Sequence, residues 1–330
     1  MSISPRRTFQ RLALVGVGLL STAFVAQHLS ASGGTHAAQA HEKEYEVRTV
    51  RADDDVLYER SFAVQRGGDL VVKLGSERVE ILRARGREAT VTVRGEGRDA
   101  RSEFERRRFT ASRAANALTV RTDPPRSVRM RSRDARFVVT IEIPAEFNGR
   151  IDVGSGSVRV DEVVGNLDVN TGSGSVTVGS ARGRRIVLDT GSGSIRAESL
   201  DGAIRADTGS GAIRIDAVRG SFEGDTGSGS IRVERADVDR FSADTGSGAV
   251  SAGLWRDAEV DIDTGSGRVE LTLPRRARAD VDLSGRPIRI DNALGFRGEQ
   301  RRGDARGEIG GGGPDMDIHT GSGGITLNAR

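Results

Sequence analysis

The sequence of 330 residues contains no cysteine, which excludes disulfide bonds, thiolate metal sites and a lipid-modified cysteine. Histidine occurs only four times, which leaves little material for a metal or nucleophilic site. Aromatic residues make up 4% of the chain, with a single tryptophan, too few for a platform on which sugar rings stack. We therefore expect no catalytic residue, no cofactor and no metal ligand, and a fold held together by aliphatic packing.

An excess of charge of one sign is also missing. The chain has 50 basic and 47 acidic residues, and three of the basic ones, Arg6, Arg7 and Arg11, lie in the first 40 positions. Residues 41–330 are therefore formally neutral. Binding of nucleic acid requires a net basic domain or stripe, so we expect no nucleic-acid partner.

Residues 1–40 have the pattern of an export signal. Arg6-Arg7 is basic, the run from Leu12 to Ala26 is apolar and uncharged, and Ala38-Gln39-Ala40 provides small residues for cleavage. The apolar run is shorter than the roughly 20 residues that span a bilayer, so we expect no transmembrane segment in the mature chain. We expect an exported protein, located in the periplasm, at the cell surface or in the medium. The segment from Arg6 to Arg11 partly matches a twin-arginine signal, and an ordinary Sec signal also fits.

What is abundant is glycine, arranged in a repeated phrase typified by Asp-Thr-Gly-Ser-Gly-Ser-Ile-Arg. Its Gly-Ser-Gly core begins at Gly154, Gly172, Gly191, Gly209, Gly227, Gly246, Gly265 and Gly321. The first seven are 18 or 19 residues apart, and the last gap of 56 residues equals three such periods. A fixed period of this size is typical of a solenoid, in which each repeat packs only on its neighbours. We assigned the short bend to glycines with positive φ.

Apolar residues alternate on both sides of each phrase, as in Ile204 and Ala206 before a bend and Ile213 and Ile215 after it. Such alternation predicts strands with one face in the core. The sequence therefore predicts an all-β fold, a right-handed parallel β-helix or β-solenoid with coils of 18–19 residues. Val163, Leu200 and Val218 lie between the two strands of a coil and leave open whether the coil has two or three sides.

Residues 41–150 lack the phrase but have strand-like alternation, longest over Phe137, Val139, Ile141 and Ile143. We therefore divide the chain into a signal peptide at 1–40, a strand-rich N-terminal β region at 41–150, and the repeat solenoid at 151–330. The N-terminal region could consist of wider coils or form a small β domain. The basic run from Arg101 to Arg113 fits either a contact for an anionic polymer or a solvated hairpin edge.

Two coils between Gly265 and Gly321 have lost the phrase. The segment from Val281 to Ile290 preserves one coil by pattern, and the segment from Arg301 to Pro314 is typical of a loop or a frayed coil. The strand Ile325-Thr326-Leu327 would then form an open terminal coil, through which copies could polymerise end to end.

Stacking the repeats creates ladders of charged side chains. One ladder contains Asp189, Asp207, Asp225, Asp244 and Asp263, and a second contains Arg196, Arg214 and Arg232 together with Arg159 and Arg289. Asp-Thr-Gly also surrounds an aspartic-protease carboxylate, but that enzyme needs two facing loops. We interpret each aspartate as accepting hydrogen bonds from its own bend. A ladder of bound divalent cations is an alternative, because stacked carboxylates repel one another. Each arginine precedes an acidic residue by two positions, which fits either a neutralised surface or a contact for an anionic polysaccharide.

The lead-in Ile141-Glu142-Ile143-Pro144 followed by Ser-Gly-Ser-Val and Ser-Gly-Ser-Ile phrases resembles the bacterial putative adhesin family. The resemblance covers roughly residues 60–330 and implies an exported β-solenoid domain. The family has no established catalytic residues to carry over to this chain.

The sequence thus favours a non-enzymatic exported or cell-envelope β-solenoid that acts as an adhesin-like binding or structural module. The partners we expect are an envelope or extracellular polysaccharide, or other copies of the chain. The alternatives are a lyase-like enzyme that acts on polysaccharide from a parallel β-helix, and an end-to-end polymerising scaffold.

Overall fold

The computed structural model describes residues 55–123 and 135–330, which lie in one compact unit. The predicted signal peptide lies outside the described residues. Within the described ranges no helix combines the length and apolar character needed to cross a bilayer. The longest helix, α1 (Ala100–Arg106), has seven residues, and a single 3₁₀ turn covers Asn292–Leu294.

Strands make up most of the structure. The first twelve are β1 (Val56–Ala63), β2 (Gly68–Leu74), β3 (Arg78–Arg83), β4 (Glu88–Glu96), β5 (Phe109–Ala114), β6 (Ala117–Thr122), β7 (Arg136–Ile143), β8 (Phe147–Val153), β9 (Val158–Val164), β10 (Leu167–Thr171), β11 (Val176–Thr190) and β12 (Ile195–Thr208). The others are β13 (Ile213–Thr226), β14 (Ile231–Thr245), β15 (Val250–Leu254), β16 (Glu259–Thr264), β17 (Val269–Leu273), β18 (Ala279–Ser284), β19 (Ile288–Ile290), β20 (Arg297–Arg301), β21 (Asp304–Ile309), β22 (Asp315–Thr320) and β23 (Ile325–Ala329).

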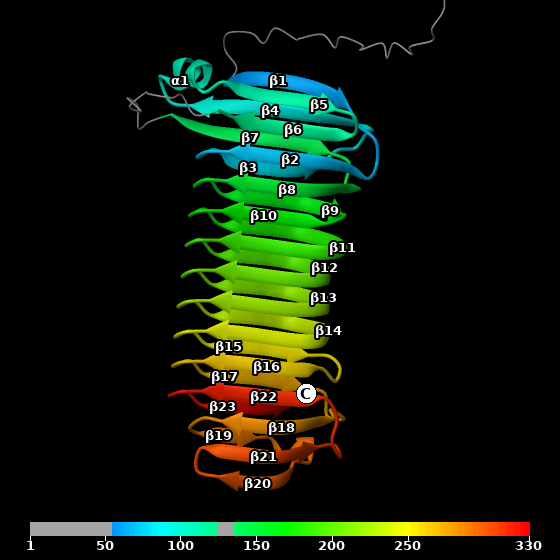
Figure 1. Ribbon diagram of the computed structural model, residues 1–330, viewed down its shortest axis with the longest axis vertical. Helices are drawn as coiled ribbons and strands as arrows, with labels where there is room; N and C mark the ends of the chain where they lie inside the picture. The colour runs from blue at the N-terminus through cyan, green and yellow to red at the C-terminus, as the bar shows by residue number, and fades with distance from the viewer. Residues whose placement is uncertain (1–54, 124–134) are drawn as a thin grey trace, which may run out of the picture. The chain divides into compact units, whose positions relative to one another are not determined.

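The fold is a β-solenoid, as predicted, and its central coils stack in parallel (Figure 1). Each coil begins after a Gly-Ser-Gly turn with a post-turn side, continues through a short third side, and ends with a pre-turn side. In β12 the three sides contribute the buried residues Ile195, Leu200 and Ile204 in that order. Ser199, Leu200 and Asp201 pair with Ala217, Val218 and Arg219 of the next coil, so the coil has three sides.

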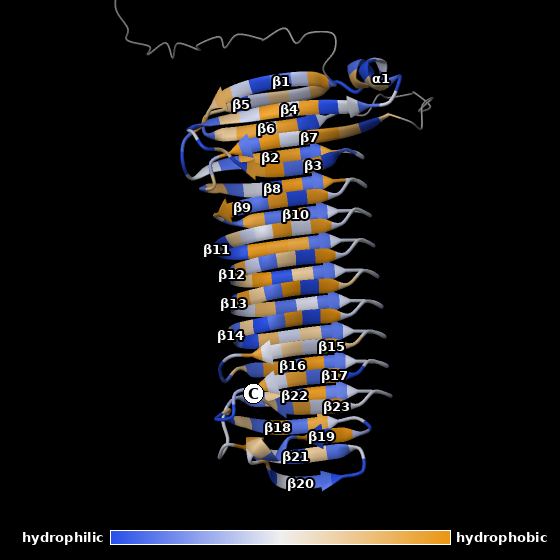
Figure 2. Ribbon diagram, turned by 180° about the vertical axis from the view of Figure 1, so that it is seen from behind, coloured by the Kyte–Doolittle hydropathy of each residue, from blue (hydrophilic) through white to orange (hydrophobic). Residues whose placement is uncertain are grey.

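Aliphatic columns fill the interior of the stack. The third side alone contributes a continuous buried column of Val163, Ala181, Leu200, Val218, Ala236 and Leu254. Apolar and polar positions alternate along the strands of every coil (Figure 2). Each fully buried Val, Leu or Ile contributes about 1.5–3 kcal/mol through removal from water. The alternations predicted in the N-terminal region are also confirmed, since Phe137, Val139, Ile141 and Ile143 are all buried.

The Gly-Ser-Gly glycines are required by the contact between coils. A Cβ atom added at Gly193 would lie 2.0 Å from the carbonyl oxygen of Gly174, and one at Gly211 would lie 1.8 Å from that of Gly193. Within the described ranges, neither glycine is among the residues with positive φ. Our assignment of these bends to positive φ was therefore wrong. Only glycine allows successive turns to stack at the strand spacing of about 4.8 Å.

The stack continues across residue 150 toward the N-terminal strands. β8 and β9 pair in parallel with β2 and β3, which in turn pair with β6 and β7. Beyond these, antiparallel pairs of β1 with β4, β4 with β7 and β5 with β6 form the end of the stack, next to α1 (Figure 1). The division of the chain at residue 150 stays a prediction, as does the right-handed winding.

The other end differs from our expectation of an open final coil. β22 pairs with both β16 and β18, and β23 pairs with both β17 and β19, so the last strands of the sequence form an interior coil. The predicted coil over 281–290 is present as β18 and β19 and lies outside it. The stretch expected to be a loop contains β21, and the antiparallel hairpin of β20 and β21 covers β18. All five residues of β20 are exposed and include Arg297, Glu299 and Arg301, whose charges oppose pairing with another strand.

Candidate binding surfaces

The threonine of each phrase, rather than the aspartate, ties the turns together. Thr190 Oγ1 donates to the carbonyl oxygen of Gly174 at 2.8 Å and accepts from the backbone N–H of Gly193 at 3.1 Å. The same pair of bonds recurs at Thr171, Thr208, Thr226, Thr245, Thr264 and Thr320. Across the described strands, none of the five phrase aspartates accepts a hydrogen bond from its turn. Our assignment of the turn bonds to aspartate was therefore wrong.

The aspartates form an outward ladder on the pre-turn side. Strand register aligns Asp189, Asp207, Asp225, Asp244 and Asp263 in successive coils. Partial burial raises the pKa of Asp189, and the neighbouring charge of Asp207 raises it further against the opposing effect of Arg205. Burial also raises the pKa of Asp225, with additional repulsion from Asp207 and Asp244. In the part of the chain that the structure describes, no three acidic or histidine side chains converge as a metal site.

The arginine ladder lies on the post-turn side. Arg196, Arg214 and Arg232 are in register, and Thr177 separates them from Arg159. Arg232 forms an ion pair with Glu234, which lowers the pKa of that carboxyl group through a direct hydrogen bond. Over the described ranges Arg196 and Arg214 have no ion pair. Acidic residues two positions along each strand keep this surface close to neutral.

The predicted basic run from Arg101 to Arg113 does not form one basic surface. It contains helix α1, which we did not predict, followed by the hairpin of β5 and β6. Arg106 forms an ion pair with Glu103 at 3.2 Å. Arg107 is largely buried, pairs with Glu77 at 2.8 Å and lies over the ring of Phe137.

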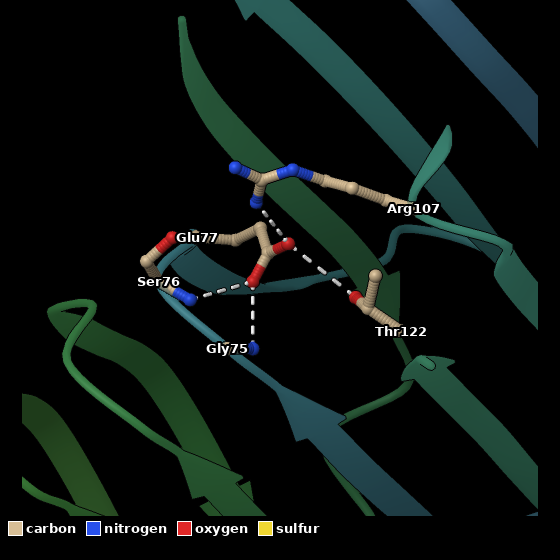
Figure 3. A network of polar contacts seen from close by, with 5 residues as sticks. All are labelled: Gly75, Ser76, Glu77, Arg107 and Thr122. Carbon is tan, nitrogen blue, oxygen red and sulfur yellow. Dashed lines mark hydrogen bonds and ion pairs between the residues drawn. The ribbon is translucent and has the colours of Figure 1, made fainter. Parts of the chain in front are cut away.

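Glu77 is the centre of a buried polar network at the first turn of the stack (Figure 3). Its Oε2 atom accepts from the backbone N–H groups of Gly75 at 2.7 Å and Ser76 at 2.9 Å. In the next coil, the corresponding N–H groups of Gly154 and Ser155 donate to the carbonyl oxygens of Leu74 and Gly75. Among the described residues no backbone carbonyl accepts from Gly75 and Ser76 in this way, and the Glu77 carboxylate caps their turn instead. The network is structural, because every Glu77 contact serves the turn or neutralises the charge.

A trough runs along the third side over several coils and has a volume of about 520 Å³. Its floor contains the outward column Ser180, Ser199 and Ala217, which strand register places in successive coils. Arg235 follows Ala217 in the same column, so a long side chain ends the row of small ones. One wall contains the ion pairs Arg182–Asp201 at 3.3 Å and Arg219–Asp237 at 3.4 Å.

Trp255 lies at the same end of the trough as Arg235. Its side chain is 51% exposed, although its backbone N–H is fixed to the carbonyl oxygen of Ala236. The guanidinium carbon of Arg235 lies 5.0 Å from the indole centroid and that of Arg330 lies 4.0 Å from it. The sequence marked Trp255 only as an isolated aromatic residue. Its surroundings depend on strands β14, β15 and β23, so periodicity alone could not reveal them.

Comparison with known proteins gives a family match. Residues 68–328 match the Toastrack DUF4097 family, and no curated protein matches the sequence. Solved structures similar to the chain include a putative lipid binding protein from Parabacteroides distasonis ATCC 8503, with 15% identity, coverage of 82% and 96% of the two chains and a TM-score of 0.44. A putative adhesin from the same organism has 12% identity, coverage of 84% and 98% and a TM-score of 0.38.

Proposed function

This chain belongs to the Toastrack DUF4097 family, and we propose that it is a non-enzymatic, exported binding module that holds an envelope or extracellular polysaccharide along its third side. The observation that carries the proposal is the trough. Small outward side chains in three successive coils, Ser180, Ser199 and Ala217, leave a channel parallel to the stacking direction. A linear polymer with its own repeat suits a surface that repeats at about the strand spacing.

The polar groups of the trough support binding rather than cleavage. Asp201 and Asp237 are both engaged in ion pairs with arginines, so neither carboxylate is unpaired. A lyase needs an unpaired base beside the sugar to remove a proton. Arg182 and Arg219 are held on this wall by the same ion pairs. Because their positions are fixed, they can orient the hydroxyl and acidic groups of a bound sugar.

The experiment is a screen of the purified protein against glycan and cell-envelope fractions. The variants Ser199→Phe and Ala217→Phe would fill the trough, and we expect each to weaken binding at least tenfold. Ser242→Phe places the same bulk at an outward position of β14 on the pre-turn side and serves as the matched control. Binding that survives both trough variants, or that Ser242→Phe weakens equally, would contradict the proposal. Release of unsaturated sugar products from any bound glycan would favour the lyase instead.

A further inference from the structure

Two arginines lie beside Trp255, at one end of the trough. Arg235 and Arg330 both lie against the indole of Trp255, and neither forms an ion pair with any residue of the described ranges. By contrast the neighbouring Arg256 is neutralised by Asp237 at 3.2 Å and Asp239 at 2.9 Å. Two arginines held on one aromatic ring, with no ion pair to a carboxylate side chain in the described ranges, form a centre of positive charge.

A hydrogen bond also holds the guanidinium group of Arg330 in place. One terminal nitrogen of Arg330 donates to the carbonyl oxygen of Leu254 at 2.8 Å, and its backbone N–H donates to Leu273. Arg235 lies within β14, one residue before the buried Ala236. Partial burial and the nearby positive charge of Arg235 both lower the pKa of Arg330. An arginine side chain carries five N–H donors, and most of those of Arg235 and Arg330 have no partner among the described residues.

We propose that Arg235, Trp255 and Arg330 form an anion-binding site that receives a carboxylate or sulfate group of an acidic polysaccharide lying in the trough. This inference rests on the proposed function and narrows its ligand to acidic glycans. The anion would relieve the repulsion between the two arginines and accept hydrogen bonds from both. The apolar face of a sugar ring would lie over the exposed edge of the indole. The row of small side chains on the trough floor leads directly to this anion site, because Arg235 occupies the register position that follows Ala217.

Trp255 is the only tryptophan of the chain, so its fluorescence reports on this site alone. We would titrate the full protein with polygalacturonate oligomers, dextran sulfate, neutral dextran and inorganic sulfate. We expect a saturable change in emission with the two acidic glycans, a weaker one with sulfate and none with neutral dextran. Affinity should fall steeply with added salt, because charge drives the contact.

The variants Arg235→Ala and Arg330→Ala should each weaken binding of the acidic glycans about tenfold or more, since each removes hydrogen bonds to a charged group. Arg150→Ala removes an exposed arginine of β8 that lacks an ion pair in the described ranges and lies on the pre-turn side, and it should leave the affinity unchanged. Circular dichroism melts of all three variants would confirm that they fold.

The outcomes separate this inference from the proposed function. Glycan binding that Ala217→Phe abolishes but that neither arginine variant weakens would overturn the anion site and leave the trough intact. An emission change that both arginine variants abolish but Ala217→Phe does not would support the anion site and contradict the trough. Equal response to neutral and acidic dextrans would overturn the anion site.

Discussion

The hydroxyl of Thr190 donates a 2.8 Å hydrogen bond to the carbonyl oxygen of Gly174, one coil earlier in the stack. Because the same oxygen atom accepts from the N–H of Gly193, one buried side chain closes its own turn and joins it to the preceding turn. Repetition of this pair in seven coils makes the column of turns a continuous hydrogen-bonded edge. The conserved geometry of the phrase is thus explained by its threonine and its second glycine.

Replacing Thr190 with valine should destabilise the protein by about 1–3 kcal/mol, because it leaves the carbonyl of Gly174 and the N–H of Gly193 buried without their partner. Valine has nearly the same shape, so packing stays constant. Thr190→Ser keeps the hydroxyl and should lose less. Chemical denaturation midpoints measure the difference, and a valine variant as stable as the native protein would contradict the role of the hydroxyl.

Replacing Glu77 with alanine should cost about 3–5 kcal/mol, because it leaves Arg107 and two turn N–H groups without a partner in a buried site. Glu77→Gln keeps an acceptor oxygen and should cost less. Amide hydrogen exchange should show the loss of protection first in β2 and β3, next to the cap. Glu146→Ala breaks the exposed pair with Arg66 and should change stability by less than about 1 kcal/mol. Equal effects of Glu77→Ala and Glu146→Ala would argue against a cap.

The aspartate ladder predicts a gain in stability on protonation. The pKa of Asp225 is raised in the folded state, so its ionised form costs stability above that pKa, and the cost is relieved as the pH falls toward the unfolded value of about 3.9. Asp225→Asn should therefore raise the melting temperature at neutral pH in low salt, with a smaller effect in high salt. The advantage should disappear below the unfolded value.

Asp291 provides a control of opposite sign. Hydrogen bonds from the backbone N–H groups of Ala293 and Ala329 lower the pKa of its carboxyl group. Asp291→Asn should therefore lower the melting temperature at neutral pH, and its effect should fade as the pH falls through the lowered pKa. Variants of Asp225 and Asp291 that shift the melting temperature in the same direction at neutral pH would contradict this account.

The interior position of β22 and β23 predicts the effect of core truncations. Ile318→Ala should cost about 2–5 kcal/mol, as should Ile262→Ala in the adjacent coil, because both side chains are fully buried between two coils. Ile288→Ala, in the partly exposed β19, should cost clearly less. Denaturation midpoints test the order, and an Ile318 variant as mild as the Ile288 variant would place β22 at an edge.

Much of this architecture could be predicted from residues that repeat. The spacing of Gly154 to Gly265 and the alternation of valine and isoleucine predicted parallel coils, whereas Leu200 left open whether a coil has two or three sides. The first turn was missed because Glu77 replaces the second glycine and β2 lies far from β8 in the sequence. Periodicity also could not show that β22 would pair with β16, because a repeat fits equally well on any coil of the same pattern.

The candidate site was less accessible to sequence reasoning. The ladders of Asp189 to Asp263 and Arg196 to Arg232 were found because they recur, and strand register confirms both alignments. Arg235, Trp255 and Arg330, by contrast, do not belong to a residue pattern that recurs from coil to coil. Their proximity arises from the stacking of coils, which places Arg330 on the indole ring of Trp255, 75 positions earlier in the sequence.

The interior coil also has a consequence for the order of assembly. A solenoid made from its N-terminal end can add each coil as soon as it is synthesised, because every new coil finds its neighbour complete. Here β18 and β19 precede β22 and β23 in the chain but pair with them. The segment from residue 274 to residue 314 therefore cannot pack on its neighbouring coil until β22 and β23 have been made. The coil of β22 and β23 is needed to complete the stack, because until it is placed β16 and β17 lack their second neighbour and β18 and β19 have no coil on which to pack.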